Sequence, residues 1–110
     1  MRGPTQQSLK LLRDRGAKPF GVEWYNPWAK RRTDLYHFID IVALEPTVMG
    51  LLGVQTTTGG HFQERIRKAE GISEYWDWLM CGNDVEFHGW RKLKGRWVPR
   101  INRVSLKDLL

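Results

Sequence analysis

The spacing of apolar side chains divides the chain into helical and extended segments. Leu9, Leu11 and Leu12 recur near helical spacing and predict a first helix from Thr5 to Arg15. A Thr or Ser side chain is expected to cap its start. Gly16 follows the last helical position, where a left-handed residue commonly ends a helix.

Apolar runs bounded by turn residues predict three strands after this helix. The first strand alternates from Phe20 to Tyr25, ends at Asn26-Pro27 and is followed by a basic loop over residues 28–33. The second and third strands, from about Leu35 to Leu44 and from about Val48 to Thr57, are separated by the turn Glu45-Pro46-Thr47. Such a short connection predicts a hairpin of neighbouring buried strands.

The pattern becomes helical again after Gly59-Gly60, because Phe62, Ile66 and Ala69 share one stripe. The remaining predicted elements are a helix over residues 61–70, a helix over residues 74–80 capped by Ser73, strands over residues 85–90 and 96–101, and a short helix after Ser105. The order is helix, three strands, two helices and two strands (αβββααββ). It predicts an α/β fold with a mixed central β-sheet flanked by helices.

Length and composition limit the class of protein. A chain of 110 residues with 41% hydrophobic and 27% charged residues predicts that residues 1–110 form a single globular domain. No apolar stretch approaches the roughly 20 residues that span a bilayer, so no membrane partner is expected. The N-terminus lacks the apolar core of a secretory signal, and Cys81 is the single cysteine. We therefore expect a cytoplasmic protein.

Positive charge is concentrated near the C-terminus of a chain whose formal net charge is +6. Residues 87–107 contain no acid and seven cations: Arg91, Lys92, Lys94, Arg96, Arg100, Arg103 and Lys107. Such a stretch is either a surface that faces phosphates or an ordinary solvated face. The chain also has six tryptophans, which could stack on bases or fill the core. We expect at least Trp24 and Trp76 to be core residues.

Asp40 is the main candidate for a functional site, because it lies inside an apolar run that predicts a buried strand. Burial of an unpaired carboxylate costs several kcal/mol, so a partner is expected. Gln55 and Thr57 share one face of the next strand, and the three side chains offer oxygen ligands that suit Mg²⁺. The alternative is a structural carboxylate paired with Arg32 or with a strand hydroxyl.

The helix over residues 61–70 is a second candidate, because its N-terminus follows the third strand directly and could meet a phosphate. Arg65 and Lys68 would extend that surface. The alternative is an amphipathic helix with a charged outer face. Glu23, Asp34 and Glu45 are interpreted as surface or ion-paired residues, although Glu23 could reach the site. The three histidines, His37, His61 and His88, lack the spacing of metal ligands.

Residues 32–40, Val54-Gln55-Thr56-Thr57 and residues 65–68 together resemble motifs of the PD-(D/E)XK nuclease superfamily, most closely its small phage and bacterial members. The resemblance covers roughly residues 5 to 90. It implies a restriction-endonuclease-like fold and a DNA-binding hydrolase, a divergent resolvase-like endonuclease that uses Mg²⁺ or Mn²⁺. It also implies a bacterial chain, or a phage-encoded one acting in the host cytoplasm.

Carried over by position, Asp40 matches the motif's aspartate and Gln55 its acidic residue, so these two would hold the metal. Thr57 occupies the lysine position, and Lys68 or Arg65 of the following helix could replace that cation. The first-helix acid of many relatives is replaced by Gln6 or Gln7. The residues expected to contact the phosphates of nucleic acid are Arg31, Arg32, Arg65, Lys68, Arg91, Lys92, Lys94 and Arg96. By analogy, a homodimer would span a duplex.

Two other classes of function remain open from the sequence. A catalytically inactive nuclease-fold module could bind DNA or a protein, for example as a phage-encoded inhibitor or accessory protein. The triplet Gln55-Thr56-Thr57 favours this interpretation, whereas the retained Asp40 favours the enzyme. A structural subunit unrelated to nucleic acid would explain the tryptophans but would leave the basic stretch unused. Binding to DNA that weakens steeply with salt would separate the first two classes from the third.

Overall fold

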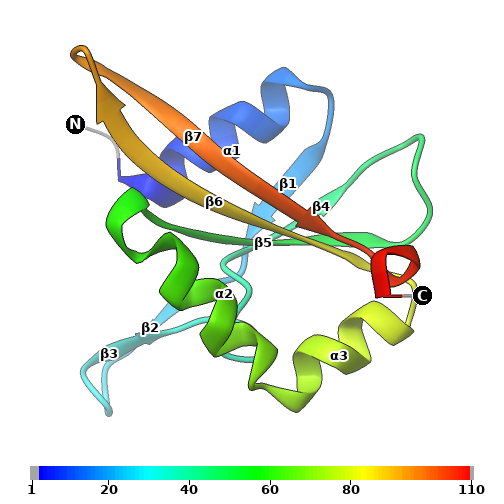
Figure 1. The fold of residues 1–110 in the computed structure, drawn as a ribbon. Coiled ribbons are helices and arrows are strands. Elements are labelled where there is room, and N and C mark those ends of the chain that lie inside the picture. The colour runs from blue at the N-terminus through cyan, green and yellow to red at the C-terminus, as the bar shows by residue number, and fades with distance from the viewer. Residues whose placement is uncertain (1–2, 110) are drawn as a thin grey trace.

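A mixed five-stranded β-sheet forms the centre of the computed structural model, which describes residues 3–109 (Figure 1). Its strands are β1 (Lys18–Gly21), β4 (Ile41–Leu44), β5 (Leu51–Thr58), β6 (Asp84–Leu93) and β7 (Arg96–Val104), adjacent in that order. β5 and β6 pair in parallel, and the other neighbours are antiparallel. The predicted α/β fold with a mixed central sheet is therefore confirmed.

Helices cover both faces of this sheet. The helix α1 (Pro4–Asp14) packs on one face, where Leu9 and Leu12 join a buried cluster with Leu52 and Val54 of β5. The short 3-10 turn η1 (Gly59–His61) leads into α2 (Phe62–Glu70), and α2 and α3 (Ser73–Met80) cover the other face. Because side chains alternate along a strand, β4 contributes to both cores, with Ile41 and Ala43 on the α1 side and Val42 on the other. A second 3-10 turn, η2 (Leu106–Leu109), follows β7.

The first predicted strand divides into two parts. Residues 18–21 form β1, whereas β2 (Trp24–Asn26) pairs with β3 (Arg31–Thr33) in a separate two-stranded sheet. The prediction of a basic loop over residues 28–33 is therefore wrong for its last three residues. Asn26 orders the intervening turn, because its side-chain oxygen accepts hydrogen bonds from the amides of Trp28 and Ala29. The result is a small hairpin that projects from the body beside α2 (Figure 1).

The second predicted strand is much shorter than expected. Only residues 41–44 form β4, and the chain folds back on itself over residues 34–40. Leu35 and Ile39 exchange two backbone hydrogen bonds across this loop, and Tyr36 and His37 have positive φ angles of 53° and 66°. Phe38 and Ile39 are fully buried all the same. The apolar run is therefore a core loop here rather than a strand.

The structure confirms the glycines predicted to end helices but not the predicted side-chain caps or core tryptophans. Gly16 has the expected positive φ of 90°, and Gly82 after α3 has one of 88°. The predicted Thr or Ser cap of α1 and the Ser73 cap are wrong, because α1 and α3 begin after Gly3 and Ile72 without a side-chain cap. The expectation for the tryptophans is also wrong. Trp24 is 55% and Trp76 39% exposed, while Trp78 and Trp90 are buried.

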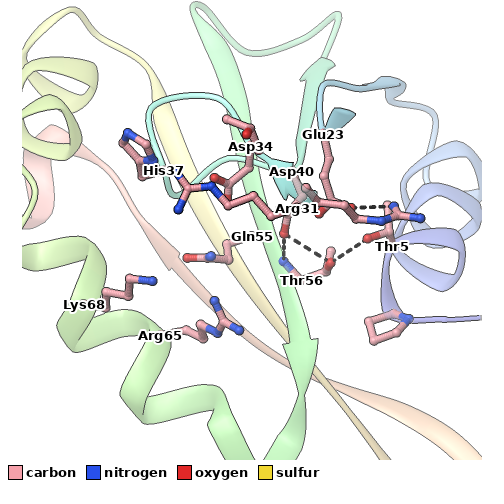
Figure 2. A pocket seen from close by; sticks show the side chains of 13 residues that line it. Thr5, Glu23, Arg31, Asp34, His37, Asp40, Gln55, Thr56, Arg65 and Lys68 are labelled. Carbon is pink, nitrogen blue, oxygen red and sulfur yellow. Dashed lines mark hydrogen bonds and ion pairs between the residues drawn. The ribbon is translucent and has the colours of Figure 1, made fainter. Parts of the chain in front are cut away.

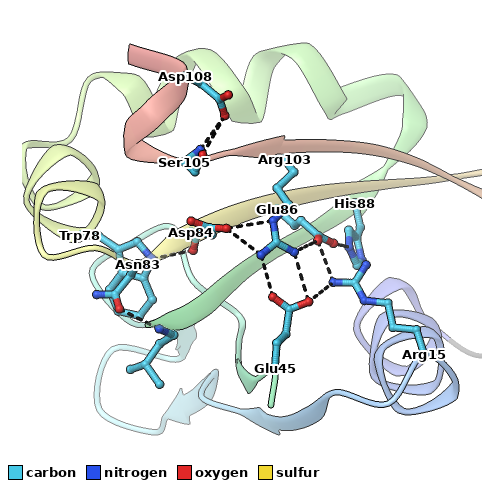
Figure 3. A network of polar contacts seen from close by, with 11 residues as sticks. Arg15, Glu45, Trp78, Asn83, Asp84, Glu86, His88, Arg103, Ser105 and Asp108 are labelled. Atoms are coloured by element: carbon cyan, nitrogen blue, oxygen red, sulfur yellow. Dashed lines mark hydrogen bonds and ion pairs between the residues drawn. The ribbon is translucent and has the colours of Figure 1, made fainter. Parts of the chain in front are cut away.

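A polar network fixes β6 and β7 to the rest of the sheet (Figure 3). The Glu86 carboxylate on β6 accepts hydrogen bonds from Arg15, at 2.7 Å, and from Arg103 on β7, at 2.8 Å. Arg103 also donates to Glu45 and Asp84, and Arg15 to Glu45. Burial would raise the pKa of Glu86, but hydrogen bonds from His88 and Arg15 outweigh it and lower the pKa to about 2.

This network continues into the core through a chain of three buried side chains. Ser8 of α1 is 2.8 Å from His88 Nδ1, and His88 Nε2 is 2.8 Å from Glu86. Trp90 Nε1 donates to the same Ser8 hydroxyl, and because ionised Glu86 can only accept, His88 Nε2 donates to it. Ser8 and His88 are completely buried. This Ser-His-Glu arrangement is therefore a structural link between α1 and β6.

Candidate functional site

A polar cavity of about 440 Å³ lies where the β2–β3 hairpin, the loop over residues 34–40, β5, α2 and the start of α1 meet (Figure 2). Most of its lining side chains are charged or polar. The lining residues are Pro4, Thr5, Glu23, Arg31, Arg32, Thr33, Asp34, His37, Asp40, Gln55, Thr56, Arg65 and Lys68. The cavity therefore brings together Asp40, Gln55 and four of the cations that the sequence singled out.

Asp40 is buried at the base of this cavity, directly before β4, with 4% of its surface exposed. Its Oδ2 accepts a hydrogen bond of 2.8 Å from the backbone amide of Thr56 and one of 3.3 Å from the Thr56 hydroxyl. The Thr56 hydroxyl also lies 3.0 Å from that of Thr5 on α1. The partner of Asp40 is thus a strand amide and hydroxyl, while Arg32 pairs with Glu23 at 2.7 Å.

The environment of Asp40 favours its protonated form. Loss of solvent raises the pKa of its carboxyl group from 3.8 to about 7, although the hydrogen bond from the Thr56 amide acts in the opposite direction. The carboxyl groups of Glu23 and Asp34 raise the pKa further, Glu23 both by hydrogen bonding and by its charge. Glu23 and Asp34 therefore add negative charge beside Asp40, and a bound cation would relieve this repulsion.

Cations enclose the acidic cluster formed by Glu23, Asp34 and Asp40. Arg65 and Lys68 extend from α2 on one side of the cavity, and Arg31 and Arg32 come from β3. Gln55 lies between Asp40 and the two α2 cations in Figure 2, and its side chain is buried. Acidic oxygens at the centre with cations around them form an arrangement that can bind a metal ion together with a phosphate.

The other residues expected at the site lie outside this cavity. Thr57 shares the face of Gln55 on β5 and is 8% exposed, but it does not line the cavity. The cations Arg91, Lys92, Lys94 and Arg96 are exposed towards the tip of the β6–β7 hairpin. Within the same basic stretch, Arg103 forms ion pairs in the network of Glu45, Asp84 and Glu86. The Arg100 guanidinium lies 4.8 Å from the Phe62 ring centroid.

The sequence interpretation missed Asp34, Thr5 and His37 as lining residues. Asp34 was interpreted as a surface residue, because residues 35–39 give no turn signal of Gly or Pro that would bring it back beside Asp40. Thr5, rather than Gln6 or Gln7, is the polar α1 side chain that lines the cavity, whereas Gln7 lines a separate groove with Trp90 and Trp97. Glu23, interpreted as a surface or ion-paired residue that could reach the site, pairs with Arg32 and lines the cavity.

The donor set suits a hard divalent cation such as Mg²⁺. Within residues 3–109, no group of three or more His, Cys, Asp or Glu side chains is arranged to hold a metal ion. Mg²⁺, however, often uses one or two carboxylates together with waters and substrate phosphate. Asp40, Glu23 and the Gln55 amide can supply protein oxygens of this kind.

Comparison of the chain with protein-family models, curated proteins and solved structures finds no significant match. Among the helices of residues 3–109, none is long and apolar enough to cross a membrane.

Proposed function

We propose that this protein acts on DNA as a metal-dependent endonuclease that hydrolyses phosphodiester bonds at the cavity around Asp40. One observation carries the proposal: a buried carboxyl group with a raised pKa, beside two further acids, lies in the same cavity as Arg31, Arg32, Arg65 and Lys68. A perturbed acid in a cleft is a frequent mark of a functional site. Its surrounding cations match the charge of a nucleic-acid backbone.

Asp40, Gln55 and Glu23 are the residues that would hold Mg²⁺ or Mn²⁺ in this proposal. When bound, such an ion polarises a phosphate and lowers the pKa of a coordinated water. Ionised Asp40 is the form that binds a cation. A bound cation would relieve the repulsion between ionised Asp40 and the neighbouring acids, and this relief would favour binding of the ion. Thr56 keeps the carboxylate in one orientation through its two hydrogen bonds.

The two cations of α2 are assigned to the phosphate in this proposal. Arg65 and Lys68 are one helical turn apart and line the same side of the cavity. They would balance the negative charge that develops on the phosphate oxygens during hydrolysis. Lys68 would in this way replace the lysine of the superfamily motif, whose position is occupied here by Thr57.

The resemblance to the PD-(D/E)XK superfamily supports this assignment. Apart from the β2–β3 hairpin, which forms a separate sheet, the elements follow one another along the chain as α1, then β1, β4 and β5, then α2 and α3, then β6 and β7. Asp40 precedes β4, and Gln55 lies on the neighbouring strand β5, as expected for the two metal-holding positions of that superfamily. The proposal includes this restriction-endonuclease-like fold.

A catalytically inactive DNA-binding module of the same fold is the second candidate. It is favoured by the position of Thr57, which is buried and does not line the cavity, and by the uncharged Gln55 in the acidic position. Such a module would retain binding to phosphates through the same cations without hydrolysis.

The test is incubation of purified protein with linear and branched DNA in the presence of Mg²⁺ or Mn²⁺. Asp40→Asn is preferable to Asp40→Ala, because asparagine still accepts the Thr56 amide hydrogen bond. We expect wild-type cleavage, and a decrease of about 100-fold or more in Asp40→Asn and in Lys68→Ala. Arg67→Ala is the matched control, since Arg67 is an exposed cation of the same helix outside the cavity.

Binding measured without divalent metal separates the two candidates. Salt-sensitive DNA binding without cleavage by the wild type would favour the inactive module, with a slope of about −0.9 in log K against log salt for each phosphate contacted. Absence of DNA binding at low salt would contradict both. Undiminished cleavage by Asp40→Asn would contradict the assigned site.

A further inference from the structure

The β2–β3 hairpin carries an unusual concentration of exposed aromatic side chains. Trp28 is 95% exposed, Tyr25 56% and Trp24 55%, although aromatic side chains of this size usually fill cores or interfaces. None of the three belongs to either buried cluster of the described residues. An exposed aromatic group of this kind marks a surface that contacts another molecule.

Hydrogen bonds in the turn of this hairpin fix the backbone at Trp28. Asn26 pairs with Arg31 across the two strands, and the Asn26 side chain accepts hydrogen bonds from the Trp28 and Ala29 amides. The backbone of Lys30 is left-handed, with a φ of 51°. Trp28 is therefore presented to solvent by an ordered turn, which reduces the entropy lost on binding a flat partner.

The charge of the hairpin indicates the chemistry of that partner. Residues 24–33 contain Lys30, Arg31 and Arg32 and no acidic residue. Arg31 and Arg32 also line the cavity of Asp40, and Arg32 is held by Glu23 at the base of the hairpin. The aromatic surface is thus continuous with the cations of the proposed active site.

Protein interfaces also use Trp, Tyr and Arg, but the combination here fits a nucleic-acid strand better. Tyr25 lies opposite Arg32 across the hairpin, whereas Trp24 shares the other face with Arg31. A strand whose phosphates contact either arginine would therefore meet an exposed aromatic ring on the same face. Paired bases hide their flat faces within the duplex stack, whereas unpaired bases expose them for stacking on aromatic rings. The partner that matches both features is therefore an unpaired strand.

We propose that the β2–β3 hairpin binds unpaired bases of DNA by stacking, and that the substrate is DNA in which a single-stranded segment adjoins the cleaved phosphate. This inference rests on the proposed function, since it names the substrate class of the same site. A fork, flap or branched junction offers such a segment, whereas a continuous duplex does not.

The test is equilibrium binding, measured by fluorescence anisotropy in EDTA so that no cleavage occurs. The probes are a fluorescently labelled forked DNA, a fully paired duplex of equal length, and matched single-stranded DNA and RNA. The variants are Trp28→Ala, Trp28→Phe, which keeps an aromatic ring, and Met49→Ala. Met49 is 91% exposed on the β4–β5 loop and serves as the matched control.

We expect the wild type to bind the fork at least about 5-fold more tightly than the duplex. Trp28→Ala should lose most of this preference by weaker fork binding, with duplex affinity within about 2-fold of wild type, while Trp28→Phe and Met49→Ala retain it. Because Trp28 is almost fully exposed, unfolding temperatures should agree among the variants.

Three outcomes would overturn this inference while leaving the proposed function intact: an unchanged fork preference in Trp28→Ala, an equal loss on fork and duplex, or a wild type that binds both alike. Tighter binding to the matched single-stranded RNA than to the DNA would overturn the choice of DNA. Absence of binding to every DNA would instead contradict the proposed function, and the inference with it.

Discussion

At Asp40, burial and hydrogen bonding act in opposite directions. Removal of the carboxyl group from water favours its neutral form, and the amide of Thr56 favours the ionised form. Burial prevails, and Glu23 and Asp34 add to it. An ionised Asp40 therefore costs folding free energy at neutral pH, a cost that sites with a function commonly carry and purely structural sites avoid.

The substitution Asp40→Asn is expected to stabilise the protein at pH 8 and to have little effect at pH 4. The pKa of Asp40 in the folded protein is about 7, above the ordinary value of 3.8. The contribution of protonated Asp40 to the free energy of unfolding is therefore complete below pH 3.8 and is lost as pH rises through 7. A shift of about three pKa units corresponds to about 4 kcal/mol. Urea unfolding in EDTA at both pH values measures the difference.

Glu64→Gln is a suitable control for Asp40→Asn, because Glu64 is an exposed carboxylate of α2 outside the cavity. Its effect on stability should be small at both pH values. An Asp40→Asn effect that is the same at pH 4 and pH 8 would contradict the assigned pKa.

Individual site residues differ in how far the sequence reveals them. Asp40 stands out because a charged residue in an apolar run is costly, and Arg65 and Lys68 follow from helical spacing. Asp34 could not be predicted, because its place in the cavity depends on left-handed backbone at Tyr36 and His37. Neither residue type signals such a conformation as glycine does.

At the scale of elements, the periodic pattern of apolar residues predicted those helices and strands that local spacing determines. It missed those that depend on tertiary contacts. Both helices on the α2–α3 face have nearly the predicted bounds, because their apolar stripes and glycines are local signals. The two strands of the final hairpin begin near the predicted residues but each ends three residues later than predicted. The run over residues 35–44 was interpreted as one strand, since a buried core loop and a buried strand have the same composition. The β2–β3 hairpin was missed because its strands are three residues each.

The contact between α2 and β6 depends on a glycine, and Gly89→Ala is expected to disrupt it. A Cβ atom at Gly89 would lie 2.5 Å from the Phe62 ring, which is itself buried under Arg100. Crowding of this kind in a packed core costs about 1 to 3 kcal/mol. The measurement is the free energy of unfolding in urea.

Gly60→Ala is the matched control for Gly89→Ala. Gly60 lies in η1, directly before α2, and no atom lies within 4 Å of a Cβ atom built at this position. Its substitution should change stability by less than about 0.5 kcal/mol. Equal stability of the two variants would show that Phe62 moves aside without cost.

For the whole molecule, the network around Glu86 joins parts of the chain that are far apart in sequence. Arg15 follows α1, Glu45 lies on the β4–β5 connection, and Arg103 belongs to the last strand (Figure 3). These contacts attach α1 and the edge strand β7 to the centre of the sheet. None of the pairings could be predicted from sequence, because they are set by strand register rather than by local spacing.

Glu86→Gln is therefore expected to destabilise the protein strongly at pH 7 and less at low pH. Glutamine removes the charge that Arg15 and Arg103 share, and because both arginines are about a third exposed, the loss of their charged partner is expected to cost about 1.5 to 3 kcal/mol. The pKa of Glu86 is lowered to about 2, so its contribution is present above the ordinary 4.5 and is lost as pH falls through 2. Urea unfolding at pH 7 and pH 2.5 measures both effects.

The exposed ion pair between Lys10 and Asp14 provides the control for Glu86→Gln. Both side chains are more than half exposed, so Asp14→Asn should change stability by about 0 to 1 kcal/mol at pH 7. If Glu86→Gln were as mild as Asp14→Asn, the network would not hold α1 and β7 to the sheet. If its effect were equally large at pH 2.5, packing rather than charge would account for the loss. A large effect at pH 7 that shrinks on acidification would identify ionised Glu86 as the group that joins α1, the β4–β5 connection and the last strand.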